Sequence, residues 1–110
     1  SAYPSMELDI ENQDDIISTS FKLYQNYPNP FNYRTHSKIY IESYDFINIA
    51  IFGLNGKKIK HLFKGDIAPG YHIFDWDGTN EFGKTVSAGL YFMSTSSDNM
   101  VQSNKMIFLK

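Results

Sequence analysis

The segment DWDGTNEFG at residues 75–83 holds the densest cluster of oxygen-bearing side chains in the chain. Carboxylate and amide oxygens are ligands that calcium prefers, and here they come from Asp75, Asp77, Asn80 and Glu81. The spacing departs from an EF-hand loop, because Gly78 follows Asp77 directly and Val86 stands where the loop has a bidentate Glu. Asp77 and Asn80 are also typical turn residues, whose side chains bond nearby backbone amides. We favour the turn interpretation and keep a calcium site as the alternative.

The residue types that commonly perform catalysis are present without a catalytic pattern. His36, His61 and His72 fall in separate β-rich runs, and none has a partner at a recognised ligand spacing. In a strand, Asp75 would point to the opposite face from His72, so we do not expect a His–Asp pair. The chain has no cysteine, no Gly-x-Ser-x-Gly elbow and no Gly-rich phosphate loop. The sequence therefore predicts a protein that is not an enzyme and needs no cofactor or metal.

The elements that position these side chains read as short strands. Apolar residues alternate with polar ones at 36–42 and 46–53, and the Asn55-Gly56 pair that follows favours a tight hairpin. No apolar pattern has helical spacing over three turns. The predicted strands, separated by turn residues that include Gly65-Asp66, cover 21–24, 36–42, 46–53, 57–63, 71–76, 89–96 and 101–109. Seven short strands in this length predict an all-β, immunoglobulin-like antiparallel β-sandwich.

Aromatic residues are expected to build most of the core, because no disulfide is available to staple the two sheets. The expected core aromatics are Phe52, Phe74, Trp76, Tyr91 and Phe92. Exposed rings could instead form a stacking platform for sugars or nucleic acid. The candidates for such a cluster are Tyr24, Tyr33, Tyr40 and Tyr44.

The charges divide the chain into two parts. Residues 1–20 carry −5 and contain no Lys or Arg, whereas the seven acidic and ten basic residues after them give +3. An acidic lead before an aromatic-rich body is typical of a linker joined to a domain. We predict a flexible linker at 1–20, in which Ser1 and Ala2 could be a cloning scar, and one domain at 21–110. The weak positive charge does not favour nucleic acid, and no apolar run predicts insertion into a membrane.

The segment NYPNPFN at 26–32 contains two prolines, which cannot lie inside a sheet. We expect an extended, turning segment that braces the start of the domain, with Tyr27 and Phe31 packed on the sandwich. At the other end, the run KMIFLK is apolar on both faces of a predicted strand. Such a strand suits the core, and an exposed edge strand would also offer its backbone to a partner.

Five blocks taken together resemble a known family, the C-terminal sorting domains (type A) of type IX secretion. They are related to the immunoglobulin-like domain of the flagellar hook-capping protein. The blocks, in order, are YPNPFN, IAIFGLNGKKIKHLF, APGYHIFDWDG, GKTVSAGLYF and KMIFLK. Two positions depart from the family pattern: Tyr33 replaces a usual Pro, and Ser37 replaces a usual apolar residue. The signature positions are Tyr27, Pro28, Asn29, Pro30, Phe31, Asn32, Trp76, Asp77, Gly78, Gly89 and Tyr91.

The resemblance implies a secretion signal without catalytic activity. Such domains follow a larger cargo protein, pass through the periplasm and are read by the outer-membrane translocon, and often a sortase-like peptidase removes them as the cargo reaches the cell surface. On this view cleavage falls in the linker 1–20. The residues that the machinery would recognise are Lys105, Met106, Ile107, Phe108, Leu109 and Lys110. Two alternatives stay open: an accessory module that binds carbohydrate or a partner domain, and a structural spacer.

Overall fold

A computed structural model describes residues 21–98 and 100–110, and the predicted linker 1–20 lies outside the described residues. Strands form where β-branched and aromatic residues alternate with polar ones, and their bounds follow the alternating pattern closely. The strands are β2 (Phe21–Leu23), β3 (Thr35–Ile41), β4 (Asp45–Gly53), β5 (Lys58–Ile67), β6 (Gly70–Trp76), β7 (Gly89–Ser96) and β8 (Val101–Phe108). Within these residues there is no helix, so the all-β prediction with seven strands is confirmed.

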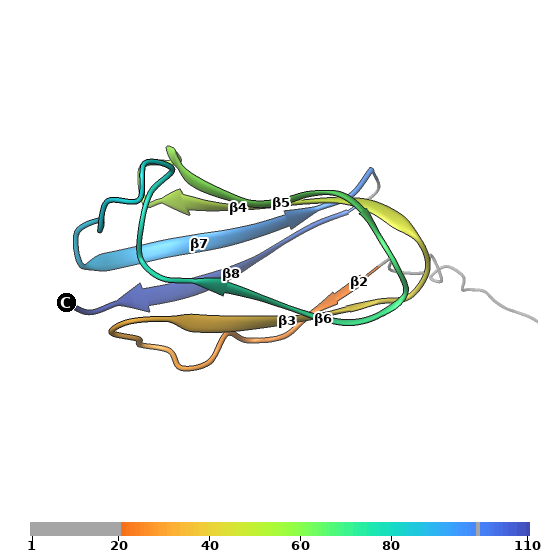
Figure 1. Cartoon of the computed structure of the whole chain (residues 1–110), viewed down its shortest axis with the longest axis horizontal. Helices are drawn as coiled ribbons and strands as arrows, with labels where there is room; N and C mark the ends of the chain where they lie inside the picture. Colours follow the sequence, from red (N-terminus) through yellow and green to blue (C-terminus); the bar gives the residue numbers. More distant parts are fainter. Residues whose placement is uncertain (1–20, 99) are drawn as a thin grey trace, which may run out of the picture.

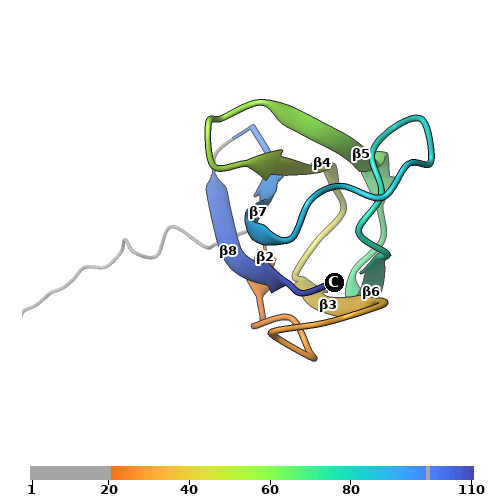
Figure 2. The ribbon, with the colours of Figure 1, turned by 90° about the vertical axis from the view of Figure 1, so that its left-hand side faces the viewer.

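The strands form two facing antiparallel sheets, which confirms the predicted sandwich. One sheet has the order β2-β3-β6, and the other has the order β5-β4-β7-β8. Figure 2 looks along the strands and shows that β2 lies next to β8 on one flank, whereas β6 lies next to β5 on the other. We call these the β2/β8 flank and the β5/β6 flank. Each flank brings together two edge strands, whose free backbone groups need covering.

One strand is longer than predicted. The predicted strand 57–63 ends before the Gly65-Asp66 pair, yet β5 continues to Ile67 because both residues pair with β4. The hairpin predicted at Asn55-Gly56 is confirmed, since Gly56 has the positive φ of 83° that such a turn requires. The two sheets extend along the long direction of the molecule (Figure 1).

The core lies between the sheets and is filled by the inward faces of all seven strands. Its buried apolar residues include Phe21, Phe31, Ile39, Ile41, Ile47, Ile49, Ile51, Ile67, Trp76, Tyr91, Met93, Met106 and Phe108. Phe74 packs partly buried against this cluster. Phe52 and Phe92 were predicted in the core, but they pair with each other on the outer face of the larger sheet. Their strands turn the neighbouring residues Ile51, Tyr91 and Met93 inward, and alternation sends both rings outward.

Candidate functional site

Signature residues from three parts of the sequence build an aromatic cluster around one ring, that of Phe108 in β8. The Phe31 ring is stacked on Phe108 with centroids 5.0 Å apart, and the Trp76 ring lies 6.0 Å away. Trp76 also contacts Phe31 at 5.6 Å and Tyr91 at 5.1 Å, both edge to face. Phe108 is only 2% exposed. The last strand is therefore held by an aromatic cluster that NYPNPFN, β6 and β7 supply together.

The two signature glycines are part of the same arrangement. Gly78 has a φ of 75°, and a Cβ at this position would stand 2.6 Å from the Phe108 ring. A larger residue would collide with that ring, so the Asp-Gly turn after β6 needs glycine for both its backbone and its close approach. Gly89 is the register partner of Phe108 across β7 and β8. Gly78 thus borders the Phe108 ring, whereas Gly89 is placed opposite Phe108 by the register of the sheet.

NYPNPFN also covers the backbone edge of β8. Asn29 Oδ1 accepts a hydrogen bond from the Ile107 amide at 2.9 Å, and Asn29 Nδ2 donates to the Lys105 carbonyl at 3.2 Å. The Phe31 amide donates to the Ile107 carbonyl at 3.0 Å, and the Phe31 carbonyl accepts from the Leu109 amide at 2.8 Å. In this way four consecutive backbone groups along the free edge of β8, from the Lys105 carbonyl to the Leu109 amide just after the strand, are hydrogen-bonded. The segment substitutes for a neighbouring strand, so this part of the edge is closed to strand addition.

Tyr27 corrects one sequence prediction. Phe31 is 1% exposed, as expected of an anchor, but Tyr27 is 78% exposed and does not pack on the sandwich. Tyr27 pairs through its backbone with His36, which directs its ring away from the core. The neighbouring buried contact is polar instead: Asn26 Nδ2 donates to Thr35 Oγ1 at 2.8 Å, and Thr35 Oγ1 donates to the Pro28 carbonyl at 2.7 Å. The brace is thus anchored by Asn26 and Phe31.

The residues proposed for recognition divide by face. Met106 and Phe108 point inward and are fully buried or nearly so. Ile107 is 37% exposed and Leu109 is 43% exposed, and Lys105 and Lys110 are exposed as well. A partner could therefore contact Lys105, Ile107, Leu109 and Lys110 from solvent, whereas Met106 and Phe108 act through packing.

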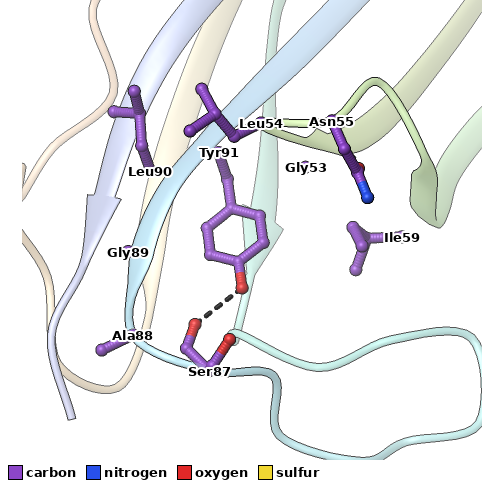
Figure 3. Close-up of a pocket in the computed structure, with 9 residues that line it drawn as sticks. All are labelled: Gly53, Leu54, Asn55, Ile59, Ser87, Ala88, Gly89, Leu90 and Tyr91. Atoms are coloured by element: carbon purple, nitrogen blue, oxygen red, sulfur yellow. Dashed lines mark hydrogen bonds between the residues drawn. The ribbon is translucent and has the colours of Figure 1, made fainter.

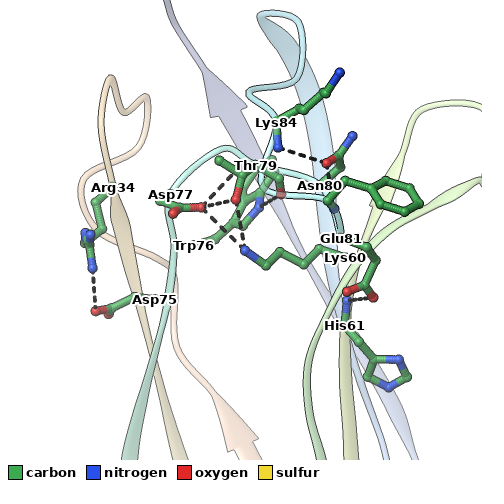
Figure 4. Close-up of polar contacts among 11 residues, drawn as sticks. Arg34, Lys60, His61, Asp75, Trp76, Asp77, Thr79, Asn80, Glu81 and Lys84 are labelled. Atoms are coloured by element: carbon green, nitrogen blue, oxygen red, sulfur yellow. Dashed lines mark hydrogen bonds and ion pairs between the residues drawn. The ribbon is translucent and has the colours of Figure 1, made fainter.

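The polar residues of 75–83 are engaged separately and do not converge (Figure 4). The Asp77 carboxylate accepts the Thr79 hydroxyl at 2.5 Å and lies 3.7 Å from Lys60 Nζ. Asn80 Oδ1 accepts from the Phe82 and Lys84 amides, and Glu81 accepts the His61 amide at 2.8 Å. These are local turn and edge contacts, as the turn interpretation predicts. Within 21–98 and 100–110 no group of three or more His, Cys, Asp and Glu is placed to hold a metal.

The fold alters the ionisation of Asp77. The hydrogen bond from the Thr79 hydroxyl lowers the pKa of the Asp77 carboxyl, and the nearby Lys60 ammonium acts in the same direction. Partial burial opposes both effects without cancelling them. The carboxylate is therefore stabilised in its charged form by the loop that it helps to fold.

Asp75 corrects a second prediction, because it does pair with a histidine. The register of β3 and β6 places His36 opposite Asp75, and His36 Nδ1 lies 2.5 Å from Asp75 Oδ1. Arg34 contacts the other carboxylate oxygen at 3.6 Å. The spacing along one strand excluded His72 as the partner of Asp75, but it could not reveal His36, which lies on the neighbouring strand. Among the described residues no hydroxyl or thiol is hydrogen-bonded to the His36 ring, so the nucleophile of a catalytic triad is missing from this pair.

A shallow pocket of about 410 Å³ lies at one end of the sandwich, between the β4–β5 turn and the start of β7. Figure 3 shows the Tyr91 hydroxyl at its wall, where it donates to the Ser87 carbonyl at 2.6 Å. The other lining residues are Gly53, Leu54, Asn55, Ile59, Ala88, Gly89 and Leu90. The hydrogen bond to the Ser87 carbonyl gives the Tyr91 hydroxyl a structural role. The residues that line the pocket include no Asp, Glu, His, Lys or Arg.

Of the four tyrosines considered for an exposed cluster, two belong to one. Tyr24 and Tyr40 gather around Tyr71, with ring centroids 6.4 Å and 4.9 Å from it. Tyr33 and Tyr44 are exposed in loops beyond this group. Tyr71 was not singled out from the sequence, because its neighbour across the sheet could be identified only once the β3–β6 register was known.

The architecture defines a β-sandwich of immunoglobulin type, and solved structures contain similar folds. Latent dimeric PorU from Porphyromonas gingivalis matches with a TM-score of 0.64 and 16% identity, over 81% of this chain and 9% of PorU. PorZ, a surface component of the type IX secretion system of P. gingivalis, matches with a TM-score of 0.51 and 14% identity, over 80% of this chain and 11% of PorZ.

A third similar structure is that of a DNA glycosylase. The alkylpurine DNA glycosylase AlkC of Pseudomonas fluorescens, bound to DNA with an abasic site analog, matches with a TM-score of 0.53 and 10% identity. The match covers 84% of this chain and 31% of AlkC. No family model and no curated protein matches the sequence. At these identities the likeness establishes the fold alone, and the chain spans only a minor part of each of these proteins.

Proposed function

We propose that this chain is a non-catalytic sorting domain of type IX secretion. It follows a covalently attached cargo, crosses the periplasm with it and is read by the outer-membrane translocon. A sortase-like peptidase then removes the domain by cleavage within 1–20, and the cargo remains at the cell surface or outside the cell.

The observation that carries the proposal is the convergence of the signature blocks on β8. Phe31, Trp76, Gly78 and Tyr91 come from three of the blocks that resemble sorting domains. Phe31, Trp76 and Gly78 lie against Phe108 of the last block, KMIFLK, and Tyr91 contacts Trp76. The fold likeness to PorZ, a component of the same secretion system, supports the proposal independently of the sequence blocks. A set of residues arranged to hold one terminal strand suits a domain whose last strand is a signal.

Recognition on this proposal uses side chains, because the backbone of β8 is already paired from Lys105 to Leu109. The exposed side chains of Lys105, Ile107, Leu109 and Lys110 are the ones that a translocon component can reach. Recognition by strand addition would first require Asn29 and Phe31 to leave the edge, and the burial of the Phe31 ring opposes that exchange.

The test is a fusion of residues 1–110 behind a periplasmic reporter, expressed in a bacterium that has the type IX system. We expect reporter on the cell surface or in the medium, and none there in a matched strain that lacks the translocon. A folded fusion that stays in the periplasm of both strains would sink the proposal.

Point variants then locate the signal more sharply than a deletion. Removing 106–110 would take Met106 and Phe108 out of the core, so loss of export would be confused with unfolding. Ile107→Ser changes an exposed side chain, and Val101→Ser is its matched control on the same strand, since Val101 is 67% exposed. We expect Ile107→Ser to reduce export severalfold and Val101→Ser to leave it unchanged, with equal melting temperatures. If both Ile107→Ser and Leu109→Ser were exported normally, the proposal that the translocon reads these side chains would be wrong.

A further inference from the structure

The outer face of the β2-β3-β6 sheet carries tyrosine and lysine side chains in adjacent rows. The first row is Lys22, Tyr40 and Tyr71, which are register partners across the three strands. In the second row the Tyr24 amide bonds the Lys38 carbonyl at 3.0 Å, and Lys38 is the register partner of Ile73. The strands β2, β3 and β6 form the lower layer of Figure 1, so this face is turned away from the other sheet.

Contacts within the rows make one continuous cluster. Lys38 Nζ lies 5.0 Å from the centroid of the Tyr24 ring and 5.2 Å from that of the Tyr71 ring. Lys22 Nζ also lies 5.0 Å from the Tyr24 ring. The ring quadrupoles hold the two ammonium groups in place through cation–π contacts. The cluster thus brings two cations and three rings together on one face of the sheet.

The cluster is open to solvent although it is rich in large apolar groups. Tyr71 is 63% exposed, Ile73 is 64% exposed and Tyr40 is 38% exposed. The outer face of the other sheet also carries a pair of rings, Phe52 and Phe92, but both are only partly exposed. An exposed face with several aromatic rings lowers solubility unless a partner covers it. Such a face therefore indicates an interaction site.

We propose that this tyrosine–lysine face binds an acidic oligosaccharide. The C–H faces of sugar rings pack on aromatic rings, tyrosine hydroxyls exchange hydrogen bonds with sugar hydroxyls, and Lys22 and Lys38 attract carboxylate or other acidic substituents. The rows repeat roughly every 7 Å along the strands and every 5 Å across them, so the face accommodates a few sugar units.

The charge of the face favours a sparsely charged ligand over a nucleic acid strand. Asp75 offsets one cation, since it pairs with Arg34 at 3.6 Å, and the two lysines of the cluster remain to meet the ligand. Nucleic acid binding gains most of its affinity from many phosphate contacts, whereas two ammonium groups match the acids of a short oligosaccharide. The tilt of 41° and 53° between the tyrosine rings also leaves no flat platform for successive bases.

The proposal is tested by titrating the whole isotope-labelled chain with oligogalacturonate and following the amide chemical shifts. We expect changes confined to β2, β3 and β6 around Tyr24, Tyr40 and Tyr71, and weaker binding of the methyl-esterified oligomer, which has the same sugar backbone without charge. Three further titrations are made. A hyaluronate oligomer tests a second acidic sugar, an oligothymidylate tests nucleic acid, and rising protein concentration in buffer alone tests self-association.

Variants separate the contribution of rings and charge. Tyr71→Ala should weaken oligogalacturonate binding about tenfold, the size of one lost stacking contact, while Tyr71→Phe keeps most of it. Lys38→Met should reduce binding of the charged oligomer and leave that of the methyl ester unchanged. Tyr44→Ala is the matched control, because Tyr44 is an exposed tyrosine outside the cluster, and it should bind as the parent chain does.

Several results would overturn the proposal. They are no shift changes with either acidic oligosaccharide, unchanged binding by a folded Tyr71→Ala, tighter binding of oligothymidylate, or burial of the face by self-association. These outcomes are independent of export, since the reporter assay changes Ile107 on the other sheet and measures no sugar binding.

Discussion

On the β2/β8 flank the free edge of β8 is covered by NYPNPFN, and on the β5/β6 flank the edge of β5 is covered by the loop that follows Trp76. In both cases one polar side chain substitutes for a strand backbone. Asn29 bonds both the amide of Ile107 and the carbonyl of Lys105. On the opposite flank the Glu81 carboxylate accepts the His61 amide at 2.8 Å, while the Glu81 amide donates to the Ile59 carbonyl at 3.1 Å.

The two covers differ in where their aromatic residue lies. Phe31 follows Asn29 by two residues and is 1% exposed among Trp76 and Phe108, whereas Phe82 follows Glu81 directly and is 88% exposed. The ring of the first cover is therefore part of the hydrophobic core, whereas the contacts of the second cover with the β5 edge are polar and lie at the surface. The difference indicates that apolar packing stabilises the cover of β8 more than it stabilises the cover of β5.

The largest expected effect is that of Phe31→Ala. It removes a fully buried ring from the aromatic cluster and should lower the free energy of unfolding by roughly 3–5 kcal/mol. Its counterpart Phe82→Ala should change that free energy by less than about 0.5 kcal/mol, because the ring is in solvent. Urea denaturation of both variants checks the pair. A loss below about 1 kcal/mol for Phe31→Ala would mean that the motif is kept for recognition and not for packing.

The next largest loss of stability is expected from Asn29, the polar residue of NYPNPFN that is hydrogen-bonded to β8. Asn29→Ala removes two hydrogen bonds from the edge of β8 and should cost about 1–2 kcal/mol. Amide hydrogen exchange should rise first at Ile107, whose amide loses its acceptor. Asn32→Ala is the matched control, since Asn32 is an exposed asparagine of the same motif. Equal exchange at Ile107 in both variants would show that Asn29 does not close the edge.

The sequence predicted what depends on local pattern and missed what depends on register. Strand positions, the sandwich and the burial of Phe31 followed from alternation and proline placement. The exposure of Tyr27, the pairing of His36 with Asp75 and the position of Tyr71 beside Tyr40 depend on which residues face each other across a sheet. The closure of the β8 edge by Asn29 was missed for the same reason, because the partners are 78 residues apart.

The departure noted at Ser37 has a structural consequence. Ser37 is fully buried on the inward face of β3, and its hydroxyl has no hydrogen-bond partner among the described residues. An apolar residue, as the family pattern has there, would avoid the cost of burying an unpaired hydroxyl. The resemblance identified this position from the sequence, and the packing explains why it is unfavourable.

A smaller effect is expected on the β5/β6 flank. Glu81→Ala removes the acceptor for the His61 amide, but water can reach this exposed site, so the cost should be about 0.5 kcal/mol. Glu81→Gln keeps an oxygen in the same place and should behave like the parent chain. Urea denaturation and hydrogen exchange at His61 check both variants. A larger loss from Glu81→Ala than from Asn29→Ala would reverse the proposed ranking of the two flanks.

The smallest expected effect on stability is that of changing Asp77. This effect depends on pH and so distinguishes the β5/β6 flank from the β2/β8 flank. Its pKa in the folded chain is lowered from 3.8, chiefly by the Thr79 hydroxyl. The charged carboxylate therefore stabilises the fold above the unfolded pKa, and this contribution is lost as the pH falls through the lower, folded value. Melting temperatures of the parent chain and Asp77→Asn should differ slightly at pH 6, begin to converge below about pH 4 and meet only below the lowered, folded pKa of Asp77.

Two further variants assign the cause of this pH dependence. Thr79→Val should remove more of it than Lys60→Met, because the hydrogen bond from Thr79 lowers the pKa of Asp77 more than the ammonium charge does. The cover of β8 uses an amide side chain and backbone groups, so acid should not loosen it through its own hydrogen bonds. Below about pH 4 hydrogen exchange should therefore rise in the loop after Trp76 before it rises at Ile107. An earlier rise at Ile107 would contradict the distinction between a core-anchored flank and a surface-anchored one.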